Sequence, residues 1–264
     1  MYLKIPLIIL LFFSNFYSTQ KIDSSFIECK YLAKFLTDTA NTNTLKKELV
    51  SLKIGKNFSL FRSDMKEKAD SIAFAEIDRS IANPVNGIAV INTGKLASAK
   101  YIPEVFYSKD KLIVYDKILN VMYNYTLETK TNWTFINEIK KIQGYTCKKA
   151  VGKYNHKTIT VWYTEEVPIS EGPYTFKNLP GLVLEAFDAN DYFHFTLESL
   201  KRIIKPIRPL EGTVNTEYSK FTKKREEVLN DPIGAFIAVF GKIPPKQNQE
   251  YMIKNIRNIN NYLD

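Results

Sequence analysis

Histidine and cysteine are scarce in this chain of 264 residues, with two of each. A structural zinc site takes four protein ligands, and a catalytic zinc site takes three and a water. Cys29, Cys147, His156 and His194 make a formal set of four, but no two of them have the short spacing of metal ligands. We therefore expect no metal site.

The sequence also lacks the common catalytic and nucleotide-binding motifs. Gly-x-Ser-x-Gly, the P-loop and the dinucleotide fingerprint do not occur. Glu165, Glu166 and Glu185 are formal candidates for an acid/base pair. Adjacent glutamates at a strand end are, however, typical of a solvated edge. We expect no catalytic residue and no cofactor, and an enzyme of unidentified class is only the third interpretation of this chain.

Long apolar runs are missing as well. The run Ile5 to Phe13 behind Lys4 has about nine residues, whereas a membrane span needs roughly 20. A short apolar core behind a positive end is typical of a secretory signal. We expect residues 1–20 to be a cleaved signal peptide and the mature protein to be exported, either periplasmic or secreted. Pro232 to Phe240 is too short to span a bilayer, so the mature chain is not expected to cross a membrane.

Positive charge is in excess, with 37 Lys and Arg against 28 Asp and Glu, a net charge of +9. Such an excess suggests nucleic acid first, but an exported protein rarely meets nucleic acid, and we expect none as a partner. Anionic envelope surfaces are the more suitable counter-charge. The simpler interpretation is that the charge serves solubility.

Cys29 and Cys147 would both enter an oxidising compartment. A disulfide between them closes a loop of about 118 residues, which the chain-entropy estimate values at about 4 to 5 kcal/mol. We expect a structural disulfide, with two buried thiols as the alternative.

Alternation of apolar and polar residues predicts many strands. Cys29, Tyr31, Ala33 and Phe35 alternate with polar neighbours, which indicates a strand with one buried face. The same pattern predicts hairpins at Asn155-His156 and at 188–191. Further strands are expected at 45–54, 57–62, 104–108, 112–116, 121–127, 132–136, 145–154, 158–164, 182–187 and 192–200. Helical spacing predicts one internal helix over 64–81, with Ser63 as its N-cap.

The pattern changes after Lys205. Pro206, Pro209 and Gly212 mark a linker. A basic helix is expected from 217 to 229, and helical spacing returns near the end of the sequence. The expected domains are the signal at 1–20, an antiparallel β domain at 21–205 and a helical C-terminal extension at 206–264. The expected fold class is mainly β with helical additions: a curved antiparallel sheet or half-barrel, one internal helix and a helical tail.

The most distinctive segment follows Gly172-Pro173 and reads Asn178-Leu179-Pro180-Gly181-Leu182-Val183. Proline followed by glycine predicts a type II turn, in which Gly181 takes a positive φ. Flanking leucines would place this turn at the edge of a core. The segment resembles the signature of the GLPGLI family, with Asn178 and Val183 as departures. The resemblance extends over about residues 25–200 and implies an exported, β-rich envelope protein. It carries no catalytic or binding residues.

Aromatic residues are the one feature that suggests binding, because they cluster on neighbouring strands. They either fill the core or line a concave sheet face, partly closed by the helix at 64–81, that holds an apolar ligand. The candidates are Tyr123, Tyr125, Trp133, Phe135, Trp162, Tyr163, Phe193 and Phe195. The leading interpretation is a non-enzymatic exported protein that binds an apolar ligand or an outer-membrane component. The alternative is a structural or assembly component of the envelope without a small-molecule ligand.

Overall fold

The computed structural model describes residues 23–84, 98–108, 111–127 and 131–264. The expected signal peptide therefore lies outside the described residues. Thirteen strands of the described chain form one sheet, ordered β13-β6-β5-β4-β3-β2-β1-β11-β10-β9-β8-β7, with β12 pairing to β1. All neighbouring pairs are antiparallel except β13 with β6. The expected class, a large antiparallel sheet with helical additions, is confirmed.

The strands have the following bounds: β1 Asp23–Leu36, β2 Leu45–Gly55, β3 Phe58–Ser63, β4 Glu104–Ser108, β5 Lys111–Ile118, β6 Val121–Leu127, β7 Trp133–Ile142, β8 Tyr145–Tyr154, β9 Lys157–Thr164, β10 Leu182–Asp188, β11 Phe193–Lys201, β12 Pro206–Ile207 and β13 Val214–Asn215. The helices are α1 Asp64–Ala82, α2 Tyr218–Asn230, α3 Pro232–Phe240 and α4 Lys246–Arg257, with a short 3₁₀ turn at Thr42–Thr44. None of the described helices is both long and apolar enough to span a membrane.

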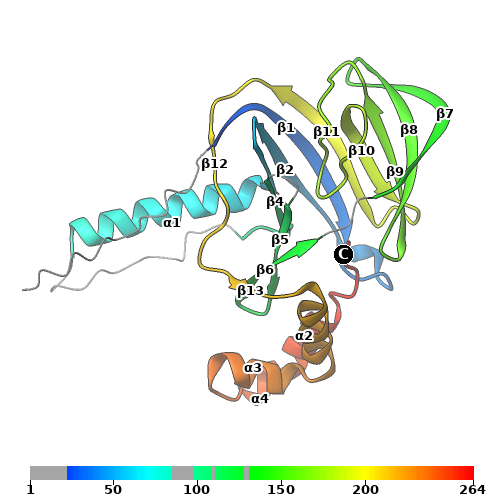
Figure 1. The fold of residues 1–264 in the computed structure, drawn as a ribbon. Coiled ribbons are helices and arrows are strands. Elements are labelled where there is room, and N and C mark those ends of the chain that lie inside the picture. Colours follow the sequence, from blue (N-terminus) through cyan, green and yellow to red (C-terminus); the bar gives the residue numbers. More distant parts are fainter. Residues whose placement is uncertain (1–22, 85–97, 109–110, 128–130) are drawn as a thin grey trace, which may run out of the picture.

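The sheet is bent around its long central strands. Figure 1 shows β1, β2 and β11 crossing the middle of the molecule, with β7–β10 curving over on one side and β4–β6 on the other. The inward faces of the central strands carry the core. On β1 the buried residues Cys29, Tyr31, Ala33 and Phe35 are at most 5% exposed, as the alternation predicts.

Helix α1 is held to the sheet by charge rather than by apolar packing. Its first turns form ion pairs with the sheet: Asp64 with Lys30, Glu67 with Lys53, and Asp70 with Arg62. Ser63 caps the helix, since its hydroxyl accepts a hydrogen bond from the Lys66 amide at 3.0 Å.

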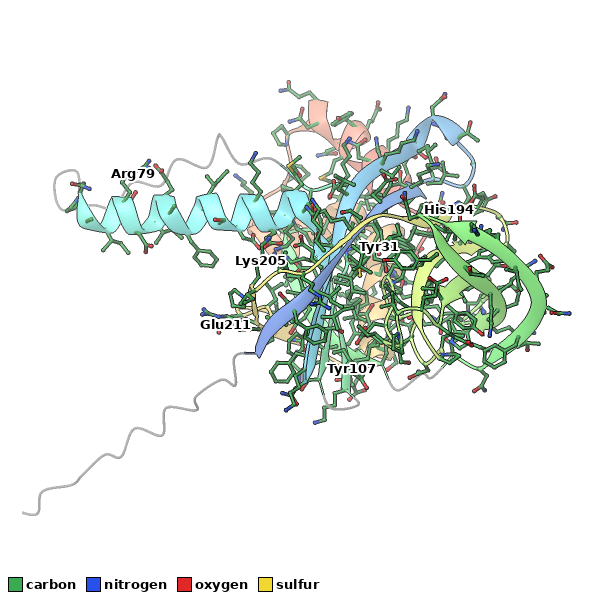
Figure 2. All side chains as sticks on the ribbon, turned by 90° about the horizontal axis from the view of Figure 1, so that it is seen from above. Tyr31, Arg79, Tyr107, His194, Lys205 and Glu211 are labelled. Carbon is green, nitrogen blue, oxygen red and sulfur yellow. The ribbon has the colours of Figure 1, made fainter. Side chains whose placement is uncertain are left out.

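Beyond these contacts α1 extends away from the body of the molecule. Figures 1 and 2 show it projecting outward, with Arg79 near its outer end. Phe74 and Ile81 are 68% and 66% exposed. The expectation that this helix partly closes a concave sheet face is therefore wrong, because the charged first turns fix its base and direct the rest of it outward.

The C-terminal region packs back onto the sheet through a few apolar anchors. Phe221 of α2 is 1% exposed and stacks on Tyr125 of β6 with ring centroids 4.8 Å apart. Leu263 is 5% exposed in the same core. The amide of Asn261 donates to the Leu36 carbonyl at 2.7 Å, which ties the last residues to the end of β1. Helix α3 was not anticipated from the sequence.

Candidate functional site

The hollow of the curved sheet is filled by the chain itself. The connection between β9 and β10 passes through it, and residues 171–177 of this connection are all buried. Tyr174 and Phe176 pack edge-on against Tyr154 of β8, with centroids 6.0 and 5.7 Å apart. The hydroxyl of Tyr31 donates to the Val183 carbonyl at 2.8 Å across the same interior. An apolar ligand in this hollow would compete with the connection for the same space.

The candidate aromatic residues do not converge on one cavity. Tyr123 and Tyr125 are covered by Phe221 of α2. Phe195 is 1% exposed and packs against Phe61 and Tyr101. These residues fill the core on the side of β6 and β11, as the alternative interpretation held.

The remaining candidates are spread over the other half of the sheet. The Trp133 indole donates to the Lys177 carbonyl at 2.8 Å, and Trp162 lies beneath the Lys140 ammonium, 4.4 Å from its ring centroid. Phe135 is 60% exposed on the edge strand β7 and contacts the buried ring of Tyr163. Of the eight, only Phe193 lines one of the three main cavities of the described structure. The expectation of a single aromatic-lined ligand site is therefore wrong, since the strands that carry these rings face different parts of the structure.

The Asn178–Val183 segment is structural, but its geometry differs from the expected turn. Leu179 and Leu182 are 2% and 0% exposed, as expected. Gly181 does not have a positive φ; the left-handed residue is Asn178, at φ 69°. Gly181 is required for another reason, because a Cβ there would lie 1.9 Å from the Thr164 carbonyl oxygen. The glycine thus permits close approach of two backbones rather than a left-handed turn.

Both cysteines are free and buried, so the expected disulfide is absent from this structure. Cys29 lies on β1 and Cys147 on β8, and β11, β10 and β9 separate these strands. At about 4.8 Å per strand, that separation exceeds the Cα distance of roughly 7 Å that a disulfide can bridge. Burial raises the pKa of the Cys29 thiol to about 12 and that of Cys147 to about 11, which leaves both in the unreactive thiol form.

A buried ion pair joins the β9–β10 connection to the sheet. The Lys177 ammonium pairs with Glu171, and their side chains are only 5% and 11% exposed. It also donates to the Ser59 hydroxyl at 2.7 Å and lies 4.4 Å from the centroid of the Tyr107 ring. Desolvation lowers the pKa of Lys177, while Glu171 opposes that shift. These contacts satisfy the Lys177 ammonium, which links the β9–β10 connection to β3.

The three glutamates considered for acid/base chemistry all have polar partners in the structure. Glu165 pairs with Lys148, and Glu166 accepts a hydrogen bond from the Thr146 amide. Glu185 pairs with Lys140 and with His194 Nε2, the latter at 3.1 Å. His194 Nδ1 lies 2.6 Å from Asp191. Within the described residues, no three His, Cys, Asp or Glu side chains are placed to hold a metal ion.

The His194–Glu185 pair predicts a pH-dependent contribution to stability. Its hydrogen bond to Glu185 raises the pKa of His194 above 6.5. Burial opposes ionisation of Glu185, but hydrogen bonds from His194 and Lys140 lower its pKa below 4.5. The contribution of His194 to the free energy of unfolding is complete below pH 6.5 and is lost as the pH rises through the folded pKa of the histidine. The contribution of Glu185 is lost as the pH falls through the folded pKa of the glutamate. We expect denaturant melts to show the largest difference in free energy of unfolding between the parent protein and His194→Gln between pH 5 and 6.5. An equal difference in free energy of unfolding at pH 8 would contradict this prediction.

A groove with a predominantly apolar wall lies between the sheet and the C-terminal helices. We call it the tail groove; its volume is about 690 Å³. The β5–β6 turn provides Ile118 and Leu119, α2 provides Val228 and Leu229, and the other main wall residues are Phe236, Met252 and Ile256. Polar groups at its edge include Lys117, Asn248 and Asn255. Small-molecule sites have this size and this mixture of apolar wall and few polar groups.

The tail groove could not be predicted from sequence patterns. Its residues come from β5 and from the C-terminal helices α2, α3 and α4, and strands β6 to β13 lie between them in the chain. The available signals were the unassigned apolar run Pro232–Phe240 and the helical spacing of Met252 and Ile256. Neither one indicates which surface the helices cover.

Comparison with known proteins finds a family model that is similar to part of the chain. A family model described as "N-glycanase peptide, N-terminal domain" matches residues 101–222, somewhat less than half of the chain. This match overturns the expected membership of the GLPGLI family, which no comparison supports. No curated protein sequence matches the chain.

Two solved structures are similar in fold. One is titled "Structure of PNGF-II in P21 space group", with 17% identity, a TM-score of 0.50 and coverage of 75% of this chain. The other, "Structure of PNGF-II in C2 space group", has 19% identity, a TM-score of 0.46 and coverage of 76% of this chain. In both cases the match spans 32% of the other chain's length. The first likeness concerns the fold alone.

Proposed function

We propose that this chain is an exported, non-enzymatic binding module that holds an apolar small molecule in the tail groove. The observation that carries the proposal is the groove of about 690 Å³ with a predominantly apolar wall, which is open at the surface of a β-rich body. Export rests on the signal-like sequence at 1–20. The ion pairs that hold Glu165, Glu185 and His194 support a non-enzymatic role.

The match to an N-glycanase N-terminal domain is compatible with a binding module. The matched region covers one part of a larger protein in the solved structures, since the similarity spans 32% of their length. A domain of this kind can serve a partner or a further domain without a reacting centre of its own. The proposal concerns the groove and does not depend on a glycan.

Leu119 supports a binding role for the tail groove. It occupies the β5–β6 turn with φ 53°, in the left-handed region that costs a residue with a Cβ about 1–2 kcal/mol. Glycine or asparagine would be the ordinary choice in such a turn. A leucine here places an apolar side chain on the groove wall, so the strain is consistent with selection for that side chain.

Fluorescence titration with 1-N-phenylnaphthylamine, a neutral apolar probe, tests the proposal. We expect saturable binding to the folded protein. Met252→Glu should weaken it at least tenfold, about 1.4 kcal/mol, because the change places a charge on the groove wall. Phe74→Glu is the matched control: it changes an exposed apolar residue on α1, far from the groove, and should leave binding unchanged. Unaltered binding in Met252→Glu, or no saturable binding at all, would rule out the tail groove.

Leu119→Gly separates binding from stability at the same site. Glycine relieves the left-handed strain, so we expect the free energy of unfolding to stay the same or to rise by up to about 1 kcal/mol. Probe binding should weaken severalfold because a wall residue is lost. Urea melts and the same titration measure both effects. A large loss of stability with unchanged binding would mean that Leu119 is there for packing alone.

A further inference from the structure

A second, smaller cavity lies between the inner face of β5 and the last residues of the chain. Its volume is about 170 Å³, enough for roughly five waters at about 30 Å³ each. Its wall is aromatic on several sides, and it contains two carboxylates: the lining includes Phe35, Tyr101, Tyr174, Phe193, Asp116 and Asp264. We call it the tyrosine cavity. Nothing in the proposed function uses it.

Asp116 lies on the face of β5 where the alternation of the strand otherwise places apolar residues. Leu112, Val114 and Ile118 share its face of β5 and are all buried. One of its oxygens accepts a hydrogen bond from the Lys117 amide at 2.7 Å. No side chain in the described part of the chain donates a hydrogen bond to it. Asp116 is itself only partly buried, but desolvation raises the pKa of its carboxyl to about 7, with a further contribution from Asp264, while the Lys117 amide and Arg225 oppose the shift.

The other carboxylate of the cavity already has its partners. Asp264 is paired with Arg225 at 2.9 and 3.2 Å, and it accepts the Tyr125 hydroxyl at 3.1 Å. The guanidinium of Arg225 is itself stacked 3.7 Å from the centroid of the Tyr262 ring. The Arg225 guanidinium is therefore paired with Asp264, and it acts on Asp116 electrostatically without forming an ion pair with it in the described structure.

A second polar group in the cavity is also without a partner. Tyr101 is 2% exposed, and its hydroxyl makes no hydrogen bond in the described structure. A buried hydroxyl left unpaired costs about 1–3 kcal/mol. Its ring is fixed edge-on against Phe35, Phe61 and Phe195, with centroids 5.4 to 5.8 Å apart. This packing fixes the orientation of Tyr101, which lines the cavity.

We propose that the tyrosine cavity binds a small organic ammonium group, with Asp116 as its counter-ion and the Tyr101 hydroxyl as a second acceptor. An ammonium ion supplies the hydrogen-bond donors that both groups lack. Aromatic faces attract such a cation, and more strongly when it is desolvated. The cavity's size limits the ligand to a short amine or to the head of a larger one. A neutral or anionic ligand would leave the charge of Asp116 uncompensated.

The charged and titratable groups around Asp116 permit a clean pH test. Asp264 and Arg225 are paired with each other, and the pKa values of Tyr101, Tyr125 and Tyr262 are all raised by burial above their usual range. Lys100 and Lys117 also line the cavity but are exposed. The pKa of Asp116, raised by desolvation to about 7, lies between pH 5.5 and 8. A cationic ligand should bind to its ionised form and be weakened by protonation.

Calorimetric or NMR titration with propylammonium, using 1-propanol as the uncharged counterpart, tests the inference. We expect saturable propylammonium binding at pH 8, at least tenfold weaker binding at pH 5.5, and no binding of 1-propanol. Asp116→Asn should lose binding while unfolding at a higher urea concentration at pH 8, because the change removes a partly buried charge. Tyr101→Phe should remain folded and bind severalfold more weakly. Asp191→Asn, a change to an exposed acid beside His194, is the control and should bind as the parent does.

Three results would overturn the inference. They are no saturable binding of propylammonium to the folded protein, equal binding of 1-propanol, and retained binding in Asp116→Asn. The higher urea midpoint of Asp116→Asn shows independently that this variant is folded, so that its loss of binding is interpretable.

Discussion

Replacement of Gly181 by alanine should destabilise the protein by about 3 kcal/mol or more. The added Cβ would lie 1.9 Å from the carbonyl oxygen and 2.6 Å from the carbonyl carbon of Thr164. Both atoms belong to the backbone at the end of β9, which pairs with β10 at Leu182. No rotamer change can relieve such an overlap, so β9 and β10 would have to separate. Urea melts that compare free energies of unfolding measure the effect.

Gly144→Ala is the matched control. Gly144 has a φ of 87° and nothing within 4 Å of an added Cβ, so its substitution should cost only the left-handed backbone term of about 1 kcal/mol. The two variants thus separate steric overlap from backbone conformation. Equal losses in both would mean that the close approach of Gly181 to Thr164 does not exist in solution.

Replacement of Lys177 by methionine should cost about 3–5 kcal/mol. The change keeps most of the side-chain volume but leaves the Glu171 carboxylate buried without its counter-charge. It also removes the hydrogen bond to the Ser59 hydroxyl, which joins the β9–β10 connection to β3. We expect an unstable protein whose connection between β9 and β10 becomes open to proteolysis.

The double variant Lys177→Met/Glu171→Gln tests the cause. Removal of both charges should recover most of the lost stability, because the main cost of the single change is an unpaired buried charge. Lys148→Met is the surface control, since Lys148 and Glu165 are 49% and 46% exposed; its unfolding curve should match that of the parent. A double variant as unstable as the single one would show that lost packing, not charge, dominates.

Local features of the sequence were sufficient to predict most individual elements. The turn at Asn155-His156 forms as expected, with Asn155 at φ 50°. The helix begins at Asp64 behind its Ser63 cap. The inward positions of β1 follow from alternation alone. These features depend on residues within one or two turns of each other, whose steric and hydrogen-bonding preferences hold in any fold.

The sites depend on which distant strands and helices meet, and sequence patterns do not contain that information. Alternation places Cys29 and Cys147 in the core, but only the strand order shows that three strands lie between them. The motif around Gly181 indicates a bend, yet the need for glycine there comes from Thr164, a residue on another strand.

The sequence by itself therefore determined that this protein is a β-rich chain with one internal helix, a helical tail and apolar anchors at Leu179 and Leu182. Only the tertiary structure decided that the β9–β10 connection fills the hollow of the sheet, that the tail forms a groove against β5, and that Asp116 faces an aromatic cavity. The physical reason is that periodicity and capping act between neighbours in the chain. Cavities and buried charges are instead set by contacts between elements that lie far apart in the chain, such as β1 or β5 and the last residues.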